Sequence, residues 1–241
     1  MVKMVPDRTG RFTDRPHYEP AELDRECDGV VRTFLNERYG RVEFPISTDD
    51  LTVLIERDAG DRDLYADLSE YGDEVEGVTL FTPGEKPSVK IAAELSEDER
   101  RENRFRTTLT HEWGHVHYHT YLWDLIDHKT GDLFGHKSHT HGNVCKRDSM
   151  LNAPYTDWME WQAGYVCGAL LMPIAALTQV VRDHLDRHDQ RAPLLCNTVE
   201  AAKLIDVVAG QFQVSREAAR VRLIKLKFLT DADSGRGLIN F

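Results

Sequence analysis

The sequence predicts an α+β protein that is mostly helical and contains one small antiparallel sheet. Three observations favour this fold class. Apolar residues recur at helical spacing through much of the chain, β-prone runs gather between residues 64 and 95, and two short amphipathic segments joined by a turn lie near the C-terminus. With 241 residues, the chain is long enough for one sizeable domain and a small appendage.

The first half of the chain predicts an arm, two helices and a sheet. Residues 1–18 mix Asp, Arg, Pro and Gly with few periodic apolar residues, which indicates a loose arm. Apolar spacing predicts helices over residues 19–39 and 48–58. The β-prone runs 78–81 and 89–91 flank a turn-forming Pro-Gly-Glu-Lys-Pro segment and predict a hairpin, to which residues 64–71 add a third strand.

The next predicted helix contains the candidate metal ligands and the candidate general base. Ser96-Glu97-Asp98-Glu99 has the form of a capping box and predicts the helix start. His111 and His115 follow in an H-E-x-x-H run; four residues of helix advance about 6 Å and turn about 40°, so both imidazoles lie on one face and can share a zinc ion. Glu112 on the flank of that face is placed to act as a general base. Two surface histidines beside a solvated glutamate are the alternative.

A third ligand is expected from another helix. Residues 158–173 contain one acid, Glu160 near the start, in an otherwise mainly apolar or small-residue run, and Pro173 ends the helix. The small residues Ala163, Gly164, Cys167, Gly168 and Ala169 would let the metal-bearing helix approach Glu160 closely. The alternative is an acid favoured only by the dipole of its helix.

The C-terminal region predicts three more helices. Residues 175–188 form the first, and residues 198–211 and 215–226 form a pair with helix-turn-helix spacing. Five basic residues lie on or just after the second helix of this pair: Arg216, Arg220, Arg222, Lys225 and Lys227. Residues 191–241 have a net charge of +3 and residues 1–190 of −14, so the acidic body argues against direct DNA binding and favours a pair packed on the core.

Two of these motifs resemble those of the ImmA/IrrE-type metallopeptidases. Residues 104–115 resemble the family run R-F-T-L-A-H-E-L-G-H, and residues 160–173 resemble its E-x-x-A…L-L-M-P signature. The resemblance covers most of residues 22–229. It implies a zincin-like metallopeptidase domain over residues 19–190, a helix-turn-helix-like segment over 191–229 packed on it, and a tail over 230–241.

The resemblance also implies a function. His111, His115 and Glu160 would bind one zinc ion and Glu112 would be the catalytic base of an endopeptidase. Its substrate would be a helix-turn-helix repressor of a mobile element or stress response. Tyr118, on the same helix face, is a candidate for stabilising the transition state, with simple packing as the alternative. A non-hydrolytic, zinc-stabilised regulatory module that binds DNA or a repressor is the competing function.

This sequence departs from the family pattern at Trp113, where Leu or Ile is usual, and in a longer His-rich connection. Within that connection, His136, His139, His141 and Cys145 have the spacing of a second zinc site, although a solvated loop is the plainer interpretation. The four cysteines show no paired spacing, and neither a secretion signal nor a 20-residue apolar run is present. We therefore expect a cytoplasmic protein that does not contact membranes.

Overall fold

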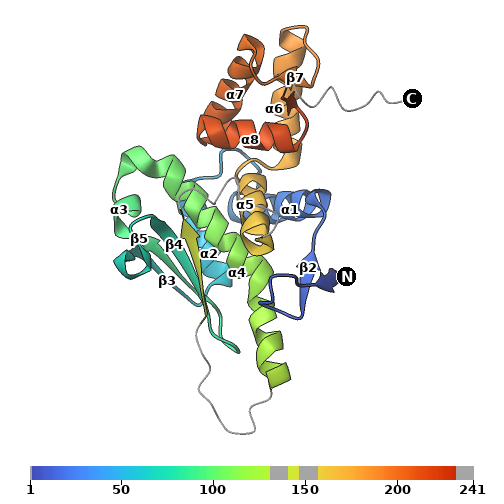
Figure 1. Ribbon diagram of the computed structural model, residues 1–241. Coiled ribbons are helices and arrows are strands. Elements are labelled where there is room, and N and C mark those ends of the chain that lie inside the picture. Colours follow the sequence, from blue (N-terminus) through green and yellow to red (C-terminus); the bar gives the residue numbers. More distant parts are fainter. Residues whose placement is uncertain (1, 131–140, 147–156, 232–241) are drawn as a thin grey trace, which may run out of the picture.

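A computed structural model describes residues 2–130, 141–146 and 157–231 of the chain. It has an α+β fold organised around one long helix, α4 (Glu102–Thr130). A four-stranded sheet lies along one side of α4, and α5 (Trp158–Leu171) and α1 (Pro20–Tyr39) lie on the other (Figure 1). The C-terminal helices gather at one end of this arrangement.

The sheet has the strand order β3-β5-β4-β6. The hairpin prediction is confirmed, since β4 (Val75–Phe81) pairs antiparallel with β5 (Ser88–Ala92). The prediction of a purely antiparallel sheet is wrong, because β3 (Asp61–Ala66) runs parallel to β5. After β3 the chain passes through the short helix η1 (Ser69–Tyr71) and forms β4, and β5 then inserts between β3 and β4. Residue patterns along the chain do not encode this strand order. β6 (His141–Lys146) pairs antiparallel with the outer side of β4.

The first two helices match their predicted bounds. α1 begins with a capping box between Glu19 and Glu22 and ends at Gly40, whose φ of 67° suits a residue without a Cβ. α2 (Thr48–Asp58) is capped by Ser47, whose side chain accepts a hydrogen bond from the Asp50 backbone N–H. The apolar faces of both helices enter the main core.

The N-terminal segment is not the loose arm that its composition predicts. β1 (Lys3–Pro6) and β2 (Asp14–His17) form an antiparallel hairpin. Phe12 packs edge-on against Trp123 and Trp158, at centroid distances of 5.0 and 6.0 Å, and Trp158 Nε1 donates to Asp7 Oδ1 at 3.0 Å. These partners lie more than 100 residues away in the chain, so local composition gives no sign of them.

The start of α4 also differs from its prediction. Two short helices, α3 (Ala93–Ser96) and η2 (Glu99–Arg101), precede it, and α4 itself begins at Glu102. Asp98, not Ser96, acts as the cap, accepting a hydrogen bond from the Arg100 backbone N–H. The S-x-x-E pattern therefore marks a helical corner a few residues before α4.

α4 and α5 approach closely, as the small residues predict. A Cβ on Gly114 would lie 3.1 Å from the Ala163 Cα, and Thr110 Oγ1 donates to Cys167 Sγ at 3.2 Å. Pro173 separates α5 from α6 (Ile174–Arg187), and the two helices meet at a bend of 59°. Among the described residues no single helix is long and apolar enough to cross a membrane; α5 and α6 reach that length only when counted together across the bend.

The C-terminal pair consists of α7 (Val199–Phe212) and α8 (Arg216–Lys225), flanked by the short parallel strands β7 (Leu194–Leu195) and β8 (Leu229–Thr230). Thr230 thus belongs to a strand, and residues 232–241 of the predicted tail lie outside the described residues. Arg222 on α8 is 1% exposed and forms an ion pair of 2.6 Å with Asp24 on α1. This buried pair fixes α8 against the core.

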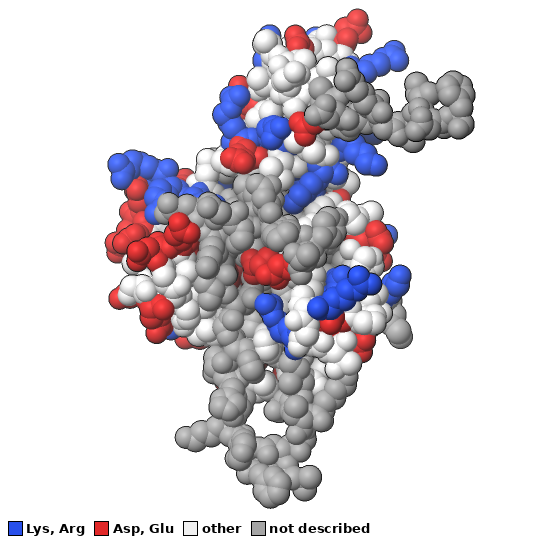
Figure 2. Space-filling model, in the orientation of Figure 1, with Lys and Arg blue, Asp and Glu red and all other residues white. Residues whose placement is uncertain are grey.

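Two other basic residues of α8 have acidic neighbours. Arg216 pairs with Asp206, and Arg220 lies 3.2 Å from Asp231. On the face shown in Figure 2, Lys and Arg side chains are interspersed with Asp and Glu over the described surface of this end of the molecule. The positive charge that the sequence concentrates on α8 is therefore partly buried and partly neutralised.

Candidate metal centre

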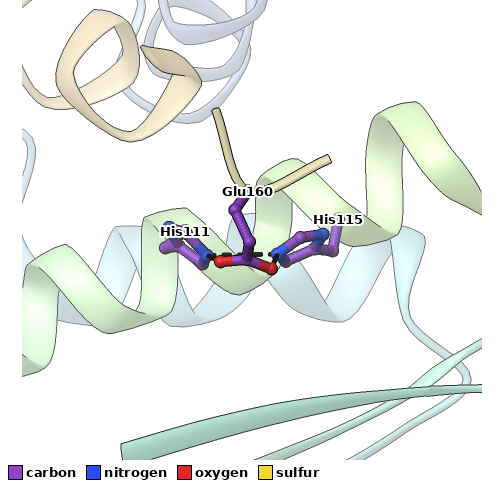
Figure 3. A group of neighbouring side chains, drawn as sticks. All are labelled: His111, His115 and Glu160. Carbon is purple, nitrogen blue, oxygen red and sulfur yellow. Dashed lines mark hydrogen bonds and ion pairs between the residues drawn. The ribbon is translucent and has the colours of Figure 1, made fainter. Parts of the chain in front are cut away.

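Two helices bring three ligand-type side chains together. His111 and His115 project from one face of α4, and Glu160 reaches them from the first turn of α5 (Figure 3). His111 Nε2 lies 3.1 Å from Glu160 Oε2, His115 Nε2 lies 3.2 Å from Glu160 Oε1, and the two Nε2 atoms are 3.1 Å apart. Both histidines are fully buried and Glu160 is 6% exposed. This group could hold a metal ion.

The spacing of these atoms suits a small, four-coordinate ion. With bonds of 2.0–2.1 Å, neighbouring ligands of a tetrahedral zinc ion are separated by about 3.3 Å, close to the three distances here. Burial would raise the pKa of Glu160, but the two imidazoles outweigh it and hold that pKa far below its usual range. Glu160 is therefore a carboxylate, and its charge faces two nitrogen atoms that would each offer a lone pair to a cation.

Glu112 lies beside this triad and is fully buried. Its Oε2 accepts a hydrogen bond of 2.5 Å from Thr79 Oγ1 on β4, and its Oε1 has no hydrogen-bond partner among the described residues. Burial raises the pKa of the Glu112 carboxyl. A carboxylate with a raised pKa and one uncommitted oxygen is suited to accept a proton.

Two residues of β4 constrain the position of the Glu112 carboxylate. The sequence pattern did not single them out. Thr79 fixes one oxygen, and Gly77 makes room for the other, because a Cβ at that position would lie 2.5 Å from Glu112 Oε1. The hairpin containing both residues was predicted. Which of its residues face α4 depends on the docking of strand on helix, and no local pattern signals it.

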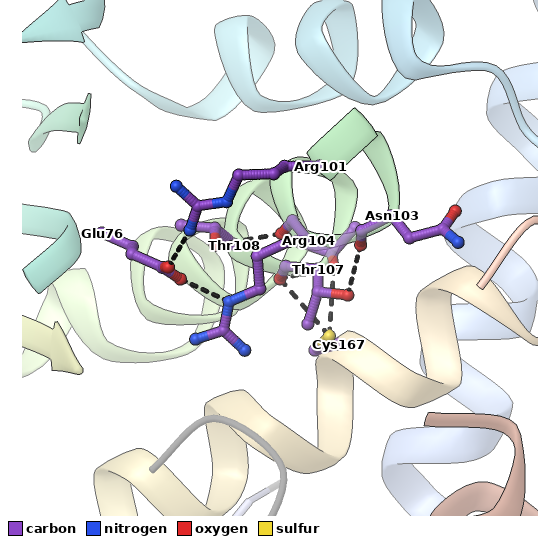
Figure 4. Close-up of polar contacts among 8 residues, drawn as sticks. Glu76, Arg101, Asn103, Arg104, Thr107, Thr108 and Cys167 are labelled. Carbon is purple, nitrogen blue, oxygen red and sulfur yellow. Dashed lines mark hydrogen bonds and ion pairs between the residues drawn. The ribbon is translucent and has the colours of Figure 1, made fainter. Parts of the chain in front are cut away.

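Charged contacts upstream of the metal centre hold β4 in place. Glu76, which is 4% exposed, forms ion pairs with Arg101, the last residue of η2, and with Arg104 in the first turn of α4 (Figure 4). The pairing of β4 with β6 shifts register between Val75 and Gly77, so Glu76 lies at an irregularity of the strand. These ion pairs fix the neighbouring Gly77 against Glu112.

Buried polar contacts also hold α4 to α5 along this stretch. The Cys167 thiol lies 3.4 Å from the Thr107 carbonyl oxygen, and the Thr107 and Thr108 hydroxyls donate to the carbonyls of Asn103 and Arg104 within α4 (Figure 4). Burial raises the pKa of Cys167, so it remains a thiol. Its role in the described structure is packing between the two helices.

Tyr118 does not point toward the triad. It is 2% exposed, packs edge-on against Tyr18 at 5.2 Å, and its hydroxyl lies 3.9 Å from Cys27 Sγ on α1. Tyr118 lies on the flank of α4 that α1 covers, and these contacts favour the packing alternative over a role in stabilising a transition state. The stripe of ligands continues instead to His119, whose Nδ1 is 3.0 Å from His115 Nδ1.

The other predictions at this site have mixed outcomes. Trp113 is buried, and its Nε1 donates to Asp58 at 3.0 Å, so this departure from the family pattern is a packing residue. The second-metal prediction is not tested. His136 and His139 lie outside the described residues, and His141 and Cys145 lie in β6, where only the backbone is described.

No protein-family model matches the chain, and no curated protein is detectably similar to it.

Proposed function

We propose that this protein is a zinc-dependent endopeptidase with a zincin-like catalytic domain. The observation that carries the proposal is the buried convergence of His111, His115 and Glu160 with a second carboxylate, Glu112, directly beside them. A purely structural zinc site needs only the ligands. It gives no reason to bury a further carboxylate with one oxygen unpartnered among the described residues, which costs free energy.

The proposed roles follow from the positions of these groups. A zinc ion held by the triad would lower the pKa of a water molecule and polarise a peptide carbonyl. Glu112 takes the proton of the attacking water on Oε1, while Thr79 holds Oε2 and keeps the carboxylate from rotating. Glu112 then passes the proton to the nitrogen of the leaving amine. The exclusion of solvent around Glu112 strengthens each of these charge interactions.

The proposed target is a specific protein, a helix-turn-helix repressor of a mobile element or stress response. This rests on the resemblance of residues 104–115 and 160–173 to the ImmA/IrrE-type metallopeptidases. A peptide added to the sheet edge could not use β4, because β5 and β6 already pair with it on both sides. The predicted hairpin is therefore not itself a free edge for substrate.

The competing function is a zinc-stabilised module that binds DNA or a repressor without hydrolysis. Its DNA-binding form would rely on the helix-turn-helix-like pair α7 and α8. The buried ion pair of Arg222 and the acidic neighbours of Arg216 and Arg220 reduce the number of cations available to phosphates. This argues against the DNA-binding form of the module.

The deciding experiment compares wild type with Glu112→Gln, which keeps the shape of the side chain but cannot accept the proton. We expect the variant to retain one zinc ion per chain and to lose cleavage of a co-expressed helix-turn-helix repressor. Removal of zinc from the wild type with a chelator should have the same effect on cleavage, and added zinc should reverse it. A Glu112→Gln variant that cuts as well as wild type would show that the assigned base is wrong. Chelator-insensitive, salt-dependent binding to duplex DNA without cleavage would support the regulatory module.

A further inference from the structure

A chain of three buried hydrogen bonds leads from His115 away from the ligand triad. His115 Nδ1 lies 3.0 Å from His119 Nδ1, and His119 Nε2 lies 3.0 Å from Gln162 Oε1 on α5. Gln162 Nε2 in turn donates to the carbonyl oxygen of Pro16, on β2, at 3.0 Å. All three side chains are at most 1% exposed, so water does not compete for these contacts.

The Pro16 carbonyl, at the outer end of this series of hydrogen bonds, fixes the donor and acceptor of every bond in it. The Pro16 carbonyl can only accept, so the nitrogen of the Gln162 amide must face it, and the Gln162 oxygen is left for His119. His119 Nε2 must then carry the hydrogen. In a neutral imidazole its Nδ1 is consequently an acceptor, and only His115 Nδ1–H can supply the bond between the two rings.

The near end requires the same arrangement. His115 Nε2 is the atom that lies 3.1 Å from His111 Nε2 and 3.2 Å from Glu160 Oε1, so it must keep its lone pair to bind a cation. Its single hydrogen then has to be on Nδ1, which faces His119. The demands of the ligand triad and of the Pro16 carbonyl agree on one tautomer for each ring.

We propose that His119 and Gln162 are positioning residues that hold His115 in its metal-binding tautomer, with the N-terminal hairpin as the outer anchor. The proposal deepens the proposed function, because it rests on the same metal centre. Histidine ligands generally donate their second ring N–H to an oriented acceptor, which raises ligand basicity. Here the acceptor is a second histidine.

Packing holds this chain of groups in place. The Trp158 ring meets the His119 ring edge-on at 5.5 Å, and the Trp158 N–H is fixed by Asp7 of the N-terminal hairpin. The N-terminal hairpin thus supports these groups at two points, since Asp7 holds Trp158 and the Pro16 carbonyl accepts from Gln162. His111 differs, since its Nδ1 has no hydrogen-bond partner among the described residues. The hydrogen-bonded series His115–His119–Gln162–Pro16, called the relay below, therefore orients one of the two histidine ligands.

The test measures zinc affinity of the full chain by competition with a chromogenic chelator. Gln162→Leu has nearly the same volume but removes the acceptor for His119, and we expect zinc to bind 10- to 100-fold more weakly, the usual range for an oriented partner of a ligand. Tyr165→Phe is the matched control. It lies one turn further along α5, is 3% exposed and loses one buried hydrogen bond, to Asp24, without any link to His115. Its zinc affinity should equal that of wild type.

A second measurement needs no substitution. Long-range 1H–15N correlation spectra of the zinc-loaded wild type distinguish the two tautomers of each histidine. We expect the hydrogen on Nδ1 of His115 and on Nε2 of His119. A hydrogen on His119 Nδ1, or a Gln162→Leu variant that binds zinc as tightly as Tyr165→Phe, would overturn the relay while leaving the peptidase intact. Failure of the wild type itself to bind zinc would overturn both the relay and the metal centre, whereas zinc binding with the expected tautomers but without cleavage would overturn the peptidase alone.

Discussion

Gly77→Ala should disable the proposed base without touching a metal ligand. The added Cβ would lie 2.5 Å from Glu112 Oε1 and 2.9 Å from Thr108 Cγ2, whereas ordinary contact begins near 3.4 Å. The carboxylate or the strand must therefore retreat by the difference, about 0.9 Å. Glu112 has little freedom to do so, because it is fully buried and Thr79 holds its other oxygen. A displacement of about 1 Å at a reacting group costs on the order of 100-fold in rate.

The assay compares cleavage rate and zinc affinity for the same protein preparations. We expect kcat to fall on the order of 100-fold and zinc affinity to stay at the wild-type value. Gly29→Ala on α1 is the matched control. Its added Cβ would meet no atom within 4 Å beyond the adjacent residues and the backbone of its own helix, so cleavage should be unchanged and the helix more stable by about 1 kcal/mol.

A double variant isolates the cause. If Gly77→Ala acts by displacing Glu112, then combining it with Glu112→Gln should cost no more activity than Glu112→Gln alone. A Gly77→Ala protein that cleaves at the wild-type rate would refute the steric reasoning. A loss of zinc in that variant would also refute it, since the damage would then have reached the ligands.

Three further predictions concern stability and the metal. Burial lowers the pKa of Lys225 from 10.5 to about 8, so between these pH values the unfolded chain binds a proton that the folded chain has released. The free energy of unfolding should therefore rise as the pH increases from about 8 to 10.5. Urea titrations of Lys225→Met should lack this rise and show a larger free energy of unfolding than wild type at pH 7. Arg222→Met should lower the free energy of unfolding by about 3–5 kcal/mol by stranding the Asp24 carboxylate, and Asp24→Asn in the same chain should recover part of it; no recovery would refute this cause. Glu160→Gln should weaken zinc binding more than Gln162→Leu does, and a variant with unchanged zinc affinity would remove Glu160 from the ligand set.

The ligand pair was predictable because its geometry is local. An H-E-x-x-H run on a helix fixes His111 and His115 on one face regardless of the rest of the fold. Glu160 required one further step, the recognition that a lone acid heads a helix of small residues. The close approach at Gly114 and Ala163 confirms why those small residues matter.

The surroundings of the triad were not predictable, because they depend on docking between distant segments. Tyr118 and His119 are neighbours in sequence, and only the position of α1 decides that the tyrosine packs and the histidine joins the ligand stripe. Gly77 and Thr79 likewise acquire their roles from the way β4 lies on α4. The N-terminal hairpin was missed for a related reason: a single aromatic residue, Phe12, anchors a segment whose composition is otherwise polar.

Arg106, on α4, is fully buried and donates to the carbonyl oxygens of Phe212 and Gln213 at the end of α7. A fragment truncated near residue 190 would leave this guanidinium without those acceptors, beside a newly exposed apolar surface. Residues 191–231 therefore form an integral part of the same folded unit as α4, and a segment exchanged for them would fit only if it offered the same two carbonyls.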